Sequence, residues 1–325
     1  MSTAAVVPET RGLSGEDAWT TLRRTGRRRL LADALLRMRV SDGFSHARSL
    51  AFLISLVAVE GVIAVVGLAA ANGGNGFSSV IAATVRGAVP GPAGEALTSA
   101  VSHAQDAGSR HGYAGLVLGT IGTLITATLA FGQLERALNR LYGIEEDRPP
   151  VAKYGRALVL ALTLGTVSTL AFVSLALGKN LLADVTTGAA SRAWNVGRWP
   201  LGLVLAGAAI TALLRTCPRR CQPQLSWLVF GSGVAVVGWA AVTVALGRFF
   251  RASHSFGDTY GPLAGMVALM LWSVLSSMVL IYGAAVAAQL EAVRSGNVGP
   301  QDQEKVDESE PVDEKARVPH ALGTT

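Results

Sequence analysis

The stretch YAGLVLGTIGTLITATLAF, residues 113–131, carries no charged side chain. As a helix with a rise of about 1.5 Å per residue it would be about 28 Å long, which matches the hydrocarbon core of a bilayer. The following stretch GQLERALNRLY, residues 132–142, keeps its leucines on one helical face, so we expect an amphipathic extension beyond the membrane. Pro149 and Pro150 must then end or bend this helix, and another apolar run starts at Ala157. The sequence therefore predicts a helical hairpin whose charged tip lies outside the lipid.

The composition extends this conclusion to the whole chain. Half of the 325 residues are hydrophobic and 15% are charged, compared with about 25% in ordinary soluble domains. We predict an all-α, polytopic membrane helix bundle with six transmembrane helices. The expected spans are residues 50–71, 113–131, 157–178, 200–214, 225–246 and 262–290.

The basic residues predict how the bundle is oriented. Of the 28 Lys and Arg residues, 21 lie in the segments 1–49, 132–156, 215–224 and 291–325, and none lies within a predicted span. Because loops rich in Lys and Arg stay in the cytoplasm, both termini are expected there. Arg greatly outnumbers Lys amid abundant Ala, Gly and Val, which is typical of a GC-rich bacterial genome. We therefore expect a multi-pass protein of the bacterial plasma (inner) membrane.

Composition also divides the chain into three parts. We expect a basic, largely disordered cytoplasmic tail over residues 1–29 and an acidic, disordered cytoplasmic tail over residues 295–325. Between them, residues 30–294 form the six-span domain with amphipathic flanking helices. The two cysteines, Cys217 and Cys221, fall on the predicted cytoplasmic side, where thiols stay reduced, and are too few for a structural zinc site.

Glu60 is the only one of the 22 acidic residues that lies inside a predicted span. An ionised carboxylate at the middle of a bilayer costs about 2.5 to 3.5 kcal/mol on insertion scales. It must be protonated, be paired, or face a wet cavity. Small residues follow it at Gly61, Ala64 and Gly67, which is typical of a surface that another helix approaches closely. Glu60 could take part in transport or proton coupling, or it could form an interhelical hydrogen bond.

The remaining polar residues give little indication of a bound ligand. The arginines at 23, 24 and 27–29 could bind anionic lipid or could simply follow the positive-inside rule, and no folded platform accompanies them that would suggest nucleic acid. We expect no cofactor and no metal, because His103 and His111 are isolated. The sequence contains no nucleophile with a base and no HExxH spacing, so we predict that the chain is not an enzyme. Nothing in it indicates a homo-oligomer.

Two stretches carry a resemblance to a known family. The first is ERALNRLYGIEEDRPPVAKYGRALVLAL, residues 135–162, and the second is YGPLAGMVALMLWSVLSSMVLIYGA, residues 260–284. Together they resemble the signatures after the second span and in the last span of the YihY/BrkB family of bacterial inner-membrane proteins, formerly labelled ribonuclease BN. The matching positions are Asn139, Tyr142, Arg148, Pro149, Arg156, Tyr260, Gly261, Trp272 and Gly283.

The resemblance implies an integral membrane protein linked to envelope integrity and, in some pathogens, to virulence. It supplies no established biochemical activity, although lipid or solute export has been proposed for the family. The ribonuclease label has no support in these residues, because the chain lacks a cluster of His and Asp of the kind that a metal-dependent nuclease needs.

Two functions remain in competition. The chain could transport or translocate a lipid or another solute, in which case Glu60 should face a cavity that is open to one side. Alternatively, it could be a structural or assembly protein of the envelope, in which case the bundle should be closed and Glu60→Gln silent. Helices broken near the midplane would favour transport, and Gly231-Ser232-Gly233 is the only candidate for such a break.

Overall fold

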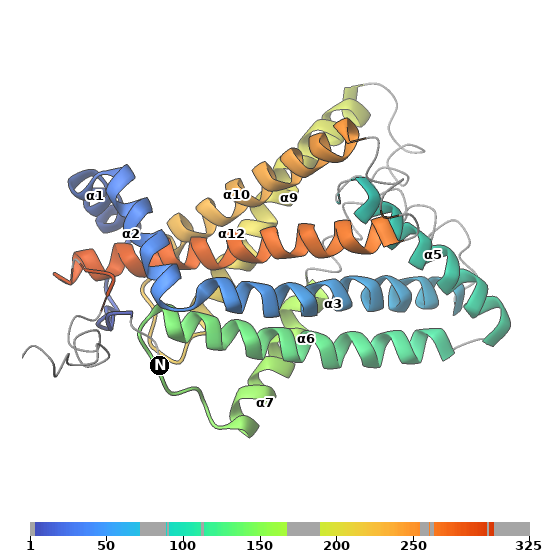
Figure 1. Ribbon diagram of the computed structural model, residues 1–325, viewed down its shortest axis with the longest axis horizontal. Coiled ribbons are helices and arrows are strands. Elements are labelled where there is room, and N and C mark those ends of the chain that lie inside the picture. The colour runs from blue at the N-terminus through green and yellow to red at the C-terminus, as the bar shows by residue number, and fades with distance from the viewer. Residues whose placement is uncertain are drawn as a thin grey trace, which may run out of the picture.

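The computed structural model describes residues 4–71, 89, 91–111, 114–167, 189–253, 260, 263–297 and 299–301, and these form an elongated bundle of helices (Figure 1). No strand occurs within these ranges, which contain a single isolated β-bridge between Ala4 and Gln301. The predicted all-α class is therefore confirmed. The helices are α1 (Gly15–Thr25), α2 (Arg27–Val40), α3 (Gly43–Ala71), α5 (Gly91–His111), α6 (Ala114–Leu141), α7 (Pro150–Leu160), α9 (Ala189–Thr216), α10 (Leu225–Ala252) and α12 (Ala264–Arg294).

Four of these helices are long and apolar enough to cross a membrane. The qualifying segments are Gly43–Val65, Leu116–Leu141, Leu225–Ala252 and Ala264–Arg294, in α3, α6, α10 and α12. A shorter apolar segment, Pro200–Thr216, coincides with the span predicted over 200–214. The span predicted over 157–178 begins in α7 and continues through a π-helical segment, Ala161–Gly165, but lies outside the described residues beyond 167. Six spans and cytoplasmic termini stay predictions.

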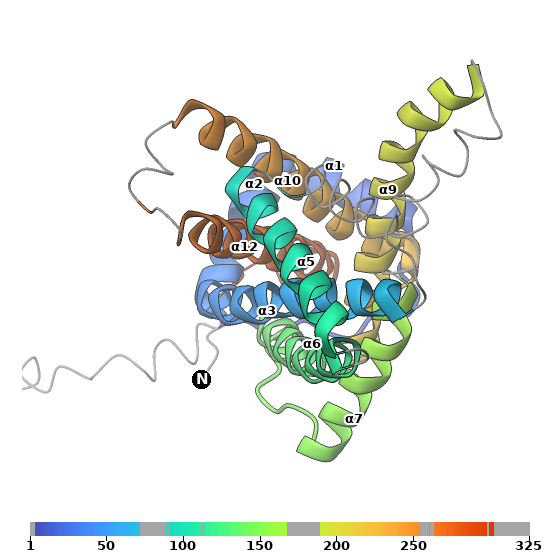
Figure 2. The ribbon, with the colours of Figure 1, turned by 90° about the vertical axis from the view of Figure 1, so that its right-hand side faces the viewer.

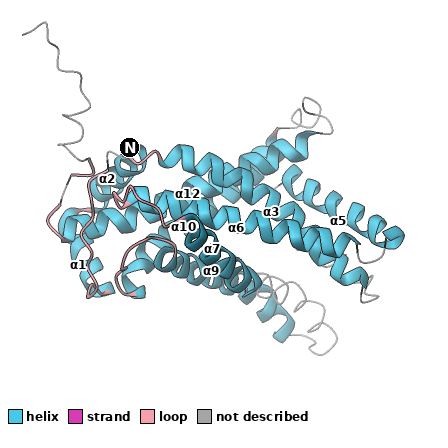
Figure 3. Ribbon diagram, turned by 90° about the horizontal axis from the view of Figure 1, so that it is seen from below, coloured by secondary structure: helices cyan, strands magenta, loops and turns pink. Residues whose placement is uncertain are grey.

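The long helices pack in a defined order around α12. Helix α3 packs against α6 and α12, and α10 packs against α12 and α9 (Figure 2). Helix α5 lies across α3 and α12 at one end of the long axis, whereas α1 and α2 lie at the opposite end (Figure 3). Towards the α5 end, α9 and α10 diverge from α12, and α7 leaves the bundle on the other side (Figure 1). The α1–α2 end is therefore where most of the chain converges.

Small residues set the closest approaches between helices. A Cβ atom at Gly67 would lie 2.7 Å from the backbone nitrogen of Leu116, and one at Gly119 would lie 2.7 Å from that of Ala64. The close approach predicted for the small residues after Glu60 is thus confirmed for the α3–α6 pair. Helices in lipid lack a hydrophobic driving force between them, so such backbone contacts supply the packing energy.

Helix α10 and α12 make a second such contact. Gly231 and Gly283 face each other, and a Cβ at Gly283 would lie 2.5 Å from the carbonyl oxygen of Gly231. Helix α10 is unbroken from Leu225 to Ala252, so Gly231–Gly233, the candidate for a broken helix, does not break it. The glycine is needed because a neighbouring backbone approaches it, which a single sequence cannot distinguish from a break.

The N-terminal segment differs from the disorder expected for residues 1–29. Helix α1 begins where the carboxylate of Asp17 accepts a hydrogen bond from the N–H of Ser14 at 3.1 Å. Trp19 packs on Phe230 of α10 with ring centroids 6.4 Å apart, and Asp17 pairs with Arg294 of α12 at 2.9 Å. These partners lie more than two hundred residues away in sequence, so local composition gives no sign of them. The C-terminal tail beyond Gln301 lies outside the described residues.

We predict that Gly283→Ala destabilises the protein. The added methyl group would overlap the Gly231 carbonyl and Ala235 Cβ, and forcing two packed helices apart typically costs about 1 to 3 kcal/mol. The measurement is the unfolding temperature in detergent micelles. Gly233→Ala is the matched control, because nothing lies within 4 Å of its Cβ position. Equal unfolding temperatures for the two variants would contradict the close packing of α10 on α12.

Candidate functional site

The residues of the first sequence motif gather at the α1–α2 end of the bundle. Asn139 on α6 is fully buried, and its amide nitrogen donates to Oδ1 of Asp147 at 3.0 Å. The amide oxygen of Asn139 accepts a hydrogen bond from the backbone N–H of Arg219 at 2.8 Å. A single side chain therefore joins the loop after α6 to the loop between α9 and α10.

Asp147 is the centre of a compact charge cluster. Its Oδ2 lies 2.9 Å from Nε of Arg136 and 2.8 Å from Nζ of Lys153, which is itself buried. Burial alone would raise the pKa of Asp147, but hydrogen bonds from Lys153, Asn139 and Arg136 together hold that pKa well below its usual range. The carboxylate is thus ionised at neutral pH and fixes the start of α7.

Arg148 and Arg156 act on the C-terminal end of α9. Arg148 Nη1 lies 3.0 Å from Oε1 of the buried Glu135, and the same guanidinium donates to the carbonyl oxygens of Cys217 and Pro218 at 2.9 Å each. Arg156 donates to the carbonyl of Thr216 at 2.8 Å. The last carbonyls of a helix carry partial negative charge and lack intrahelical partners, so two cations stabilise this terminus.

The two prolines that follow Arg148 determine where α7 begins. Pro149 is the N-cap residue of α7 and Pro150 its first residue, a position where the missing proline N–H costs nothing. The preceding helix α6 includes the predicted amphipathic extension but stops at Leu141, eight residues before Pro149, so the prolines do not end it.

Tyr142 belongs to a second, fully buried group at the same end. The guanidinium of Arg220 lies 4.3 Å from the centre of the Tyr142 ring, and its Nη2 pairs with Oε1 of Glu291 at 2.7 Å. Arg220 also donates to the carbonyl of Pro8, and the hydroxyl of Thr10 donates to Glu291. Burial raises the pKa of the Tyr142 hydroxyl, so it stays protonated. The ion pair thereby connects the N-terminal segment, α6, the α9–α10 loop and α12.

Arg37 on α2 closes this group from the other side. Its Nε donates to Oε1 of Gln289 at 2.7 Å, and its Nη1 donates to the carbonyls of Ala5 and Leu141 at 2.9 and 3.0 Å. Burial lowers the pKa of Arg37 to about 10, which leaves the side chain charged at neutral pH. The two groups together, hereafter the polar cluster, comprise Arg37, Glu135, Arg136, Asn139, Tyr142, Asp147, Arg148, Lys153, Arg156, Arg219, Arg220, Gln289 and Glu291.

Several members of the polar cluster were not singled out from the sequence. Glu135, Asp147 and Lys153 lie within the quoted motif, so their spacing to Arg148 offered a signal. Arg219 and Arg220 lie in the loop between α9 and α10, and they contact carbonyls and carboxylates of the bundle. No pattern in the sequence around Arg37 indicated its role in the polar cluster.

Glu60 lies apart from this cluster, between the two helices that pack most closely. Its Oε1 is 3.2 Å from the position of a Cβ at Gly122 of α6. Its Oε2 is buried and has no hydrogen-bond partner among the described residues. Neither of the two cavities described below is lined by Glu60. The structure thus places the carboxyl group in the α3–α6 interface and leaves one of its oxygens without a protein partner there.

The second sequence motif packs α12 against its neighbours. Nε1 of Trp272 donates to the hydroxyl of Thr243 on α10 at 3.2 Å, and Gly283 meets Gly231 as described above. Tyr260 is exposed, and Gly261 lies outside the described residues. The two motifs therefore do not form one site.

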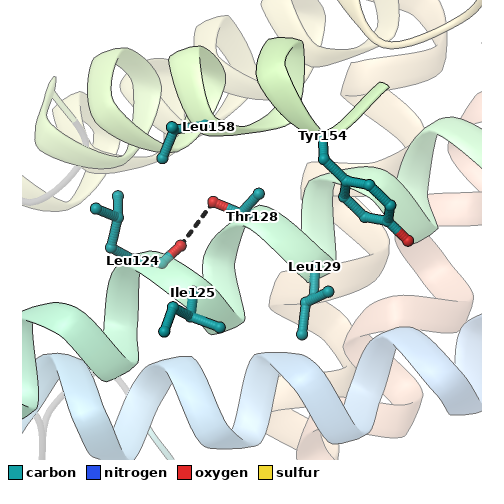
Figure 4. A pocket seen from close by; sticks show the side chains of 6 residues that line it. All are labelled: Leu124, Ile125, Thr128, Leu129, Tyr154 and Leu158. Atoms are coloured by element: carbon teal, nitrogen blue, oxygen red, sulfur yellow. Dashed lines mark hydrogen bonds between the residues drawn. The ribbon is translucent and has the colours of Figure 1, made fainter. Parts of the chain in front are cut away.

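An apolar groove lies between α6 and α7 (Figure 4). Its volume is about 340 Å³. The Thr128 hydroxyl donates to the Leu124 carbonyl of its own helix at 2.7 Å, so the wall presents little polarity. The lining residues are Leu124, Ile125, Thr128, Leu129, Tyr154 and Leu158. A second cavity, lined mainly by polar residues, adjoins the start of α10. Among the described residues no three His, Cys, Asp or Glu side chains are grouped so as to hold a metal ion.

Comparison with known proteins places these features in context. The family model for the virulence factor BrkB matches residues 34–308. A ribonuclease-like protein of Bacillus subtilis, YfkH, is 25% identical over 200 residues, which cover 60% of this chain and 71% of that protein. UPF0761 membrane proteins of Paraburkholderia xenovorans and Rhodospirillum centenum are 28% and 29% identical over 55% and 56% of this chain. In those two comparisons the match spans 41% of the relative's length. No solved structure matches.

We predict that Arg148→Gln lowers the free energy of unfolding by about 3 to 5 kcal/mol, because removing one partner leaves Glu135 charged and buried. The double variant Glu135→Gln/Arg148→Gln should lose less than the sum of the two single variants. The measurement is unfolding in detergent micelles. Glu146→Gln is the control, since its ion pair with Arg219 is long and exposed and should contribute less than about 1 kcal/mol. Additive single effects would contradict the pairing.

We predict that the stability of the folded protein depends on pH through the ionisation of Asp147. Its pKa is lower in the folded protein than the value of about 3.9 in an unfolded chain, so its contribution is fully present above about pH 4 and is lost as the pH falls further. Asp147→Asn should therefore be less stable than the wild type at pH 7, and the two unfolding temperatures should converge below about pH 4. Parallel curves between pH 7 and 3 would show that Asp147 is not the group responsible.

Proposed function

We propose, for a chain that belongs to the virulence factor BrkB family, a role in moving a lipid or another solute across the bacterial plasma membrane and thereby in maintaining the cell envelope. The chain is a multi-pass membrane protein, with four helices that meet the requirements for crossing a bilayer. The observation that carries the proposal is the carboxyl group of the half-buried Glu60, which lies against Gly122 and whose Oε2 is buried and unpartnered among the described residues. We propose no enzymatic activity.

Neither cavity is lined by Glu60, so the open cavity expected beside it for transport is not among the two described, and the proposal rests on an acidic group within a membrane-length helix whose Oε2 has no hydrogen-bond partner among the described residues. Ionisable residues inside membrane helices are rare and often mark proton and ion pathways. A carboxyl group that takes up and releases a proton during a transport cycle needs such a site, where its charge state depends on which side water can enter. The proposed function therefore assigns proton coupling to Glu60.

The groove between α6 and α7 supports a hydrophobic substrate. Its walls are aliphatic except for Thr128 and Tyr154, and Leu124, Ile125 and Leu129 belong to the segment of α6 that meets the requirements for a membrane span. A volume of about 340 Å³ lies at the lower end of the range for ligand sites, and the chemistry suits an acyl chain.

The orientation proposed here has both ends of the chain in the cytoplasm. Ala5 donates a backbone hydrogen bond to Pro300 at 3.1 Å, so the two described ends lie on the same side of the bundle. Same-side termini require an even number of spans, and the excess of Lys and Arg in the adjoining loops favours the cytoplasmic side.

A structural or assembly role is the second candidate, and the polar cluster favours it. Buried ion pairs tie the N-terminal segment, two loops and α12 into one unit at the end of the bundle, which suits a scaffold. A scaffold would tolerate Glu60→Gln, because the amide keeps the size of the carboxyl group and can still form a hydrogen bond.

We predict that Glu60→Gln abolishes transport without unfolding the protein. Purified wild type and variant are reconstituted into vesicles with a fluorescently labelled phospholipid in one leaflet, and the rate at which the label appears in the other leaflet is measured. The wild type should exceed empty vesicles, and Glu60→Gln should fall to the rate of empty vesicles. Glu95→Gln makes the same chemical change at an exposed position on α5 and should transport normally.

Two results would argue against the proposal. Equal transport by the wild type and Glu60→Gln would remove the role of this carboxyl group. Transport by neither, with both proteins inserted and folded, would favour the structural role over lipid movement.

A further inference from the structure

The second cavity lies where the N-terminal segment crosses the start of α10. Its volume is about 280 Å³. It is lined by Arg11, Arg215, Gln222, Pro223, Gln224, Leu225 and Ser226. These residues come from the N-terminal segment, the last turn of α9, the α9–α10 loop and the first turn of α10. The polar cluster, Glu60 and the α6–α7 groove contribute none of the lining, so the cavity is a separate feature.

Hydrogen bonds fix the walls of this cavity. The backbone N–H of Gln224 donates to the carbonyl of Leu13 at 3.2 Å, and the N–H of Gly15 donates to the Ser226 hydroxyl at 3.1 Å. The N-terminal segment is therefore held across the start of α10. Arg11 is kept beside the cavity, where its Nη2 approaches Sγ of Cys221 at 3.2 Å. These hydrogen bonds hold the walls of the cavity in place without a ligand.

The cavity is positively charged and uncompensated. Arg11 and Arg215 form no ion pair with any described residue, and no carboxylate lines the cavity. Outside the lining, Glu9 accepts a hydrogen bond from the N–H of Cys221, and Asp17 pairs with Arg294. Two guanidinium groups that line one cavity match the oxygens of a phosphate group, which they can bind through several parallel hydrogen bonds.

Two further features add to the attraction for an anion. Helix α10 begins beside the cavity without a side-chain cap, so the positive end of its dipole lies there, although the N–H of Trp227 already donates to the Gln224 carbonyl at 3.0 Å. Gln222 lies beside the Tyr142 hydroxyl, yet neither of its amide atoms has a hydrogen-bond partner of good geometry among the described residues. A buried amide in that condition is available to a ligand after a small rotation.

The apolar residues beside the cavity indicate that the phosphate belongs to a membrane lipid. Leu225 lines the cavity and is exposed, and Val229, one turn further along α10, is also exposed. Both begin the apolar segment Leu225–Ala252, so the cavity lies at the level where a membrane helix starts. We propose that Arg11 and Arg215 bind the phosphate headgroup of an anionic membrane lipid, whose acyl chain follows Leu225 and Val229 along α10. The site does not depend on lipid being transported.

The test uses the full chain, purified in a neutral detergent. The probe is dioctanoyl phosphatidic acid, and binding is measured as the rise in unfolding temperature with probe concentration. Dioctanoylglycerol, which lacks the phosphate, and inorganic phosphate, which lacks the chains, are the two comparison ligands. The variant is Arg11→Gln/Arg215→Gln. The matched control is Arg27→Gln/Arg28→Gln, which removes the same charge from exposed positions on α2 that do not line the cavity.

We expect phosphatidic acid to stabilise the wild type and the Arg27→Gln/Arg28→Gln control with the same affinity. Loss of both cavity arginines should weaken binding about 25-fold, at about fivefold for each cation near an anionic lipid. Dioctanoylglycerol should have no effect. An equal loss of affinity in both double variants would overturn the proposal in favour of diffuse attraction to the basic N-terminal region. Inorganic phosphate acting at the same concentrations as the lipid would overturn the lipid assignment, and an unchanged affinity in the cavity variant would overturn the site itself.

Discussion

The buried ion pair between Arg220 and Glu291 is the contact on which one end of this molecule depends. Taking two charges out of water costs several kcal/mol for each ion, and Coulomb attraction offsets this only when further hydrogen bonds complete the arrangement. Here the Pro8 carbonyl, the Thr10 hydroxyl and the face of Tyr142 add such contacts, while Nη1 of Arg220 and Oε2 of Glu291 have no hydrogen-bond partner among the described residues. Because these groups come from four separate segments, the pair is stable only when all four segments are in place. The ion pair therefore ties the order of the N-terminal segment to the packing of α6 and α12.

The membrane-crossing part of the bundle follows a different physical rule. Between lipid-exposed helices there is no gain from removing apolar surface from water, so close backbone contact and dispersion replace the hydrophobic effect. The Gly231–Gly283 and Gly119–Ala64 contacts supply this. Two kinds of interaction therefore determine the structure of different parts of the bundle. Glycine contacts determine how closely the helices approach within the bilayer, and the polar cluster determines how their ends and loops are arranged outside it.

This division explains which features the sequence could predict. Apolar runs of membrane length predicted α3, α6, α10 and α12, and the motif containing Asn139 and Arg148 predicted a set of residues that the structure brings together. The partners of those residues were harder to identify. Arg37 bonds to Gln289, 252 residues away, and Glu291 pairs with Arg220, 71 residues away, so both gain their roles only through tertiary contact. The order of residues 4–29 likewise depends on α10 and α12. The Gly231–Gly233 segment was a candidate for a broken helix because a glycine that admits a neighbouring helix has the same sequence pattern as one that breaks its own.

The acidic residues of the bundle differ in whether a cation pairs with them. Glu135, Asp147 and Glu291 are each held by an arginine or a lysine within about hydrogen-bonding distance, so the cost of their burial is offset locally. Glu60 has no such cation among the described residues, although an oxygen without a hydrogen-bond partner there is a feature that it shares with Glu135 and Glu291. Packing of α3 on α6 does not need it, because Ala64 and Gly67 already bring the two backbones into contact with Gly119 and Leu116. Glu60 is therefore a residue that the packing of α3 on α6 does not require, and the proposed transport role depends on it.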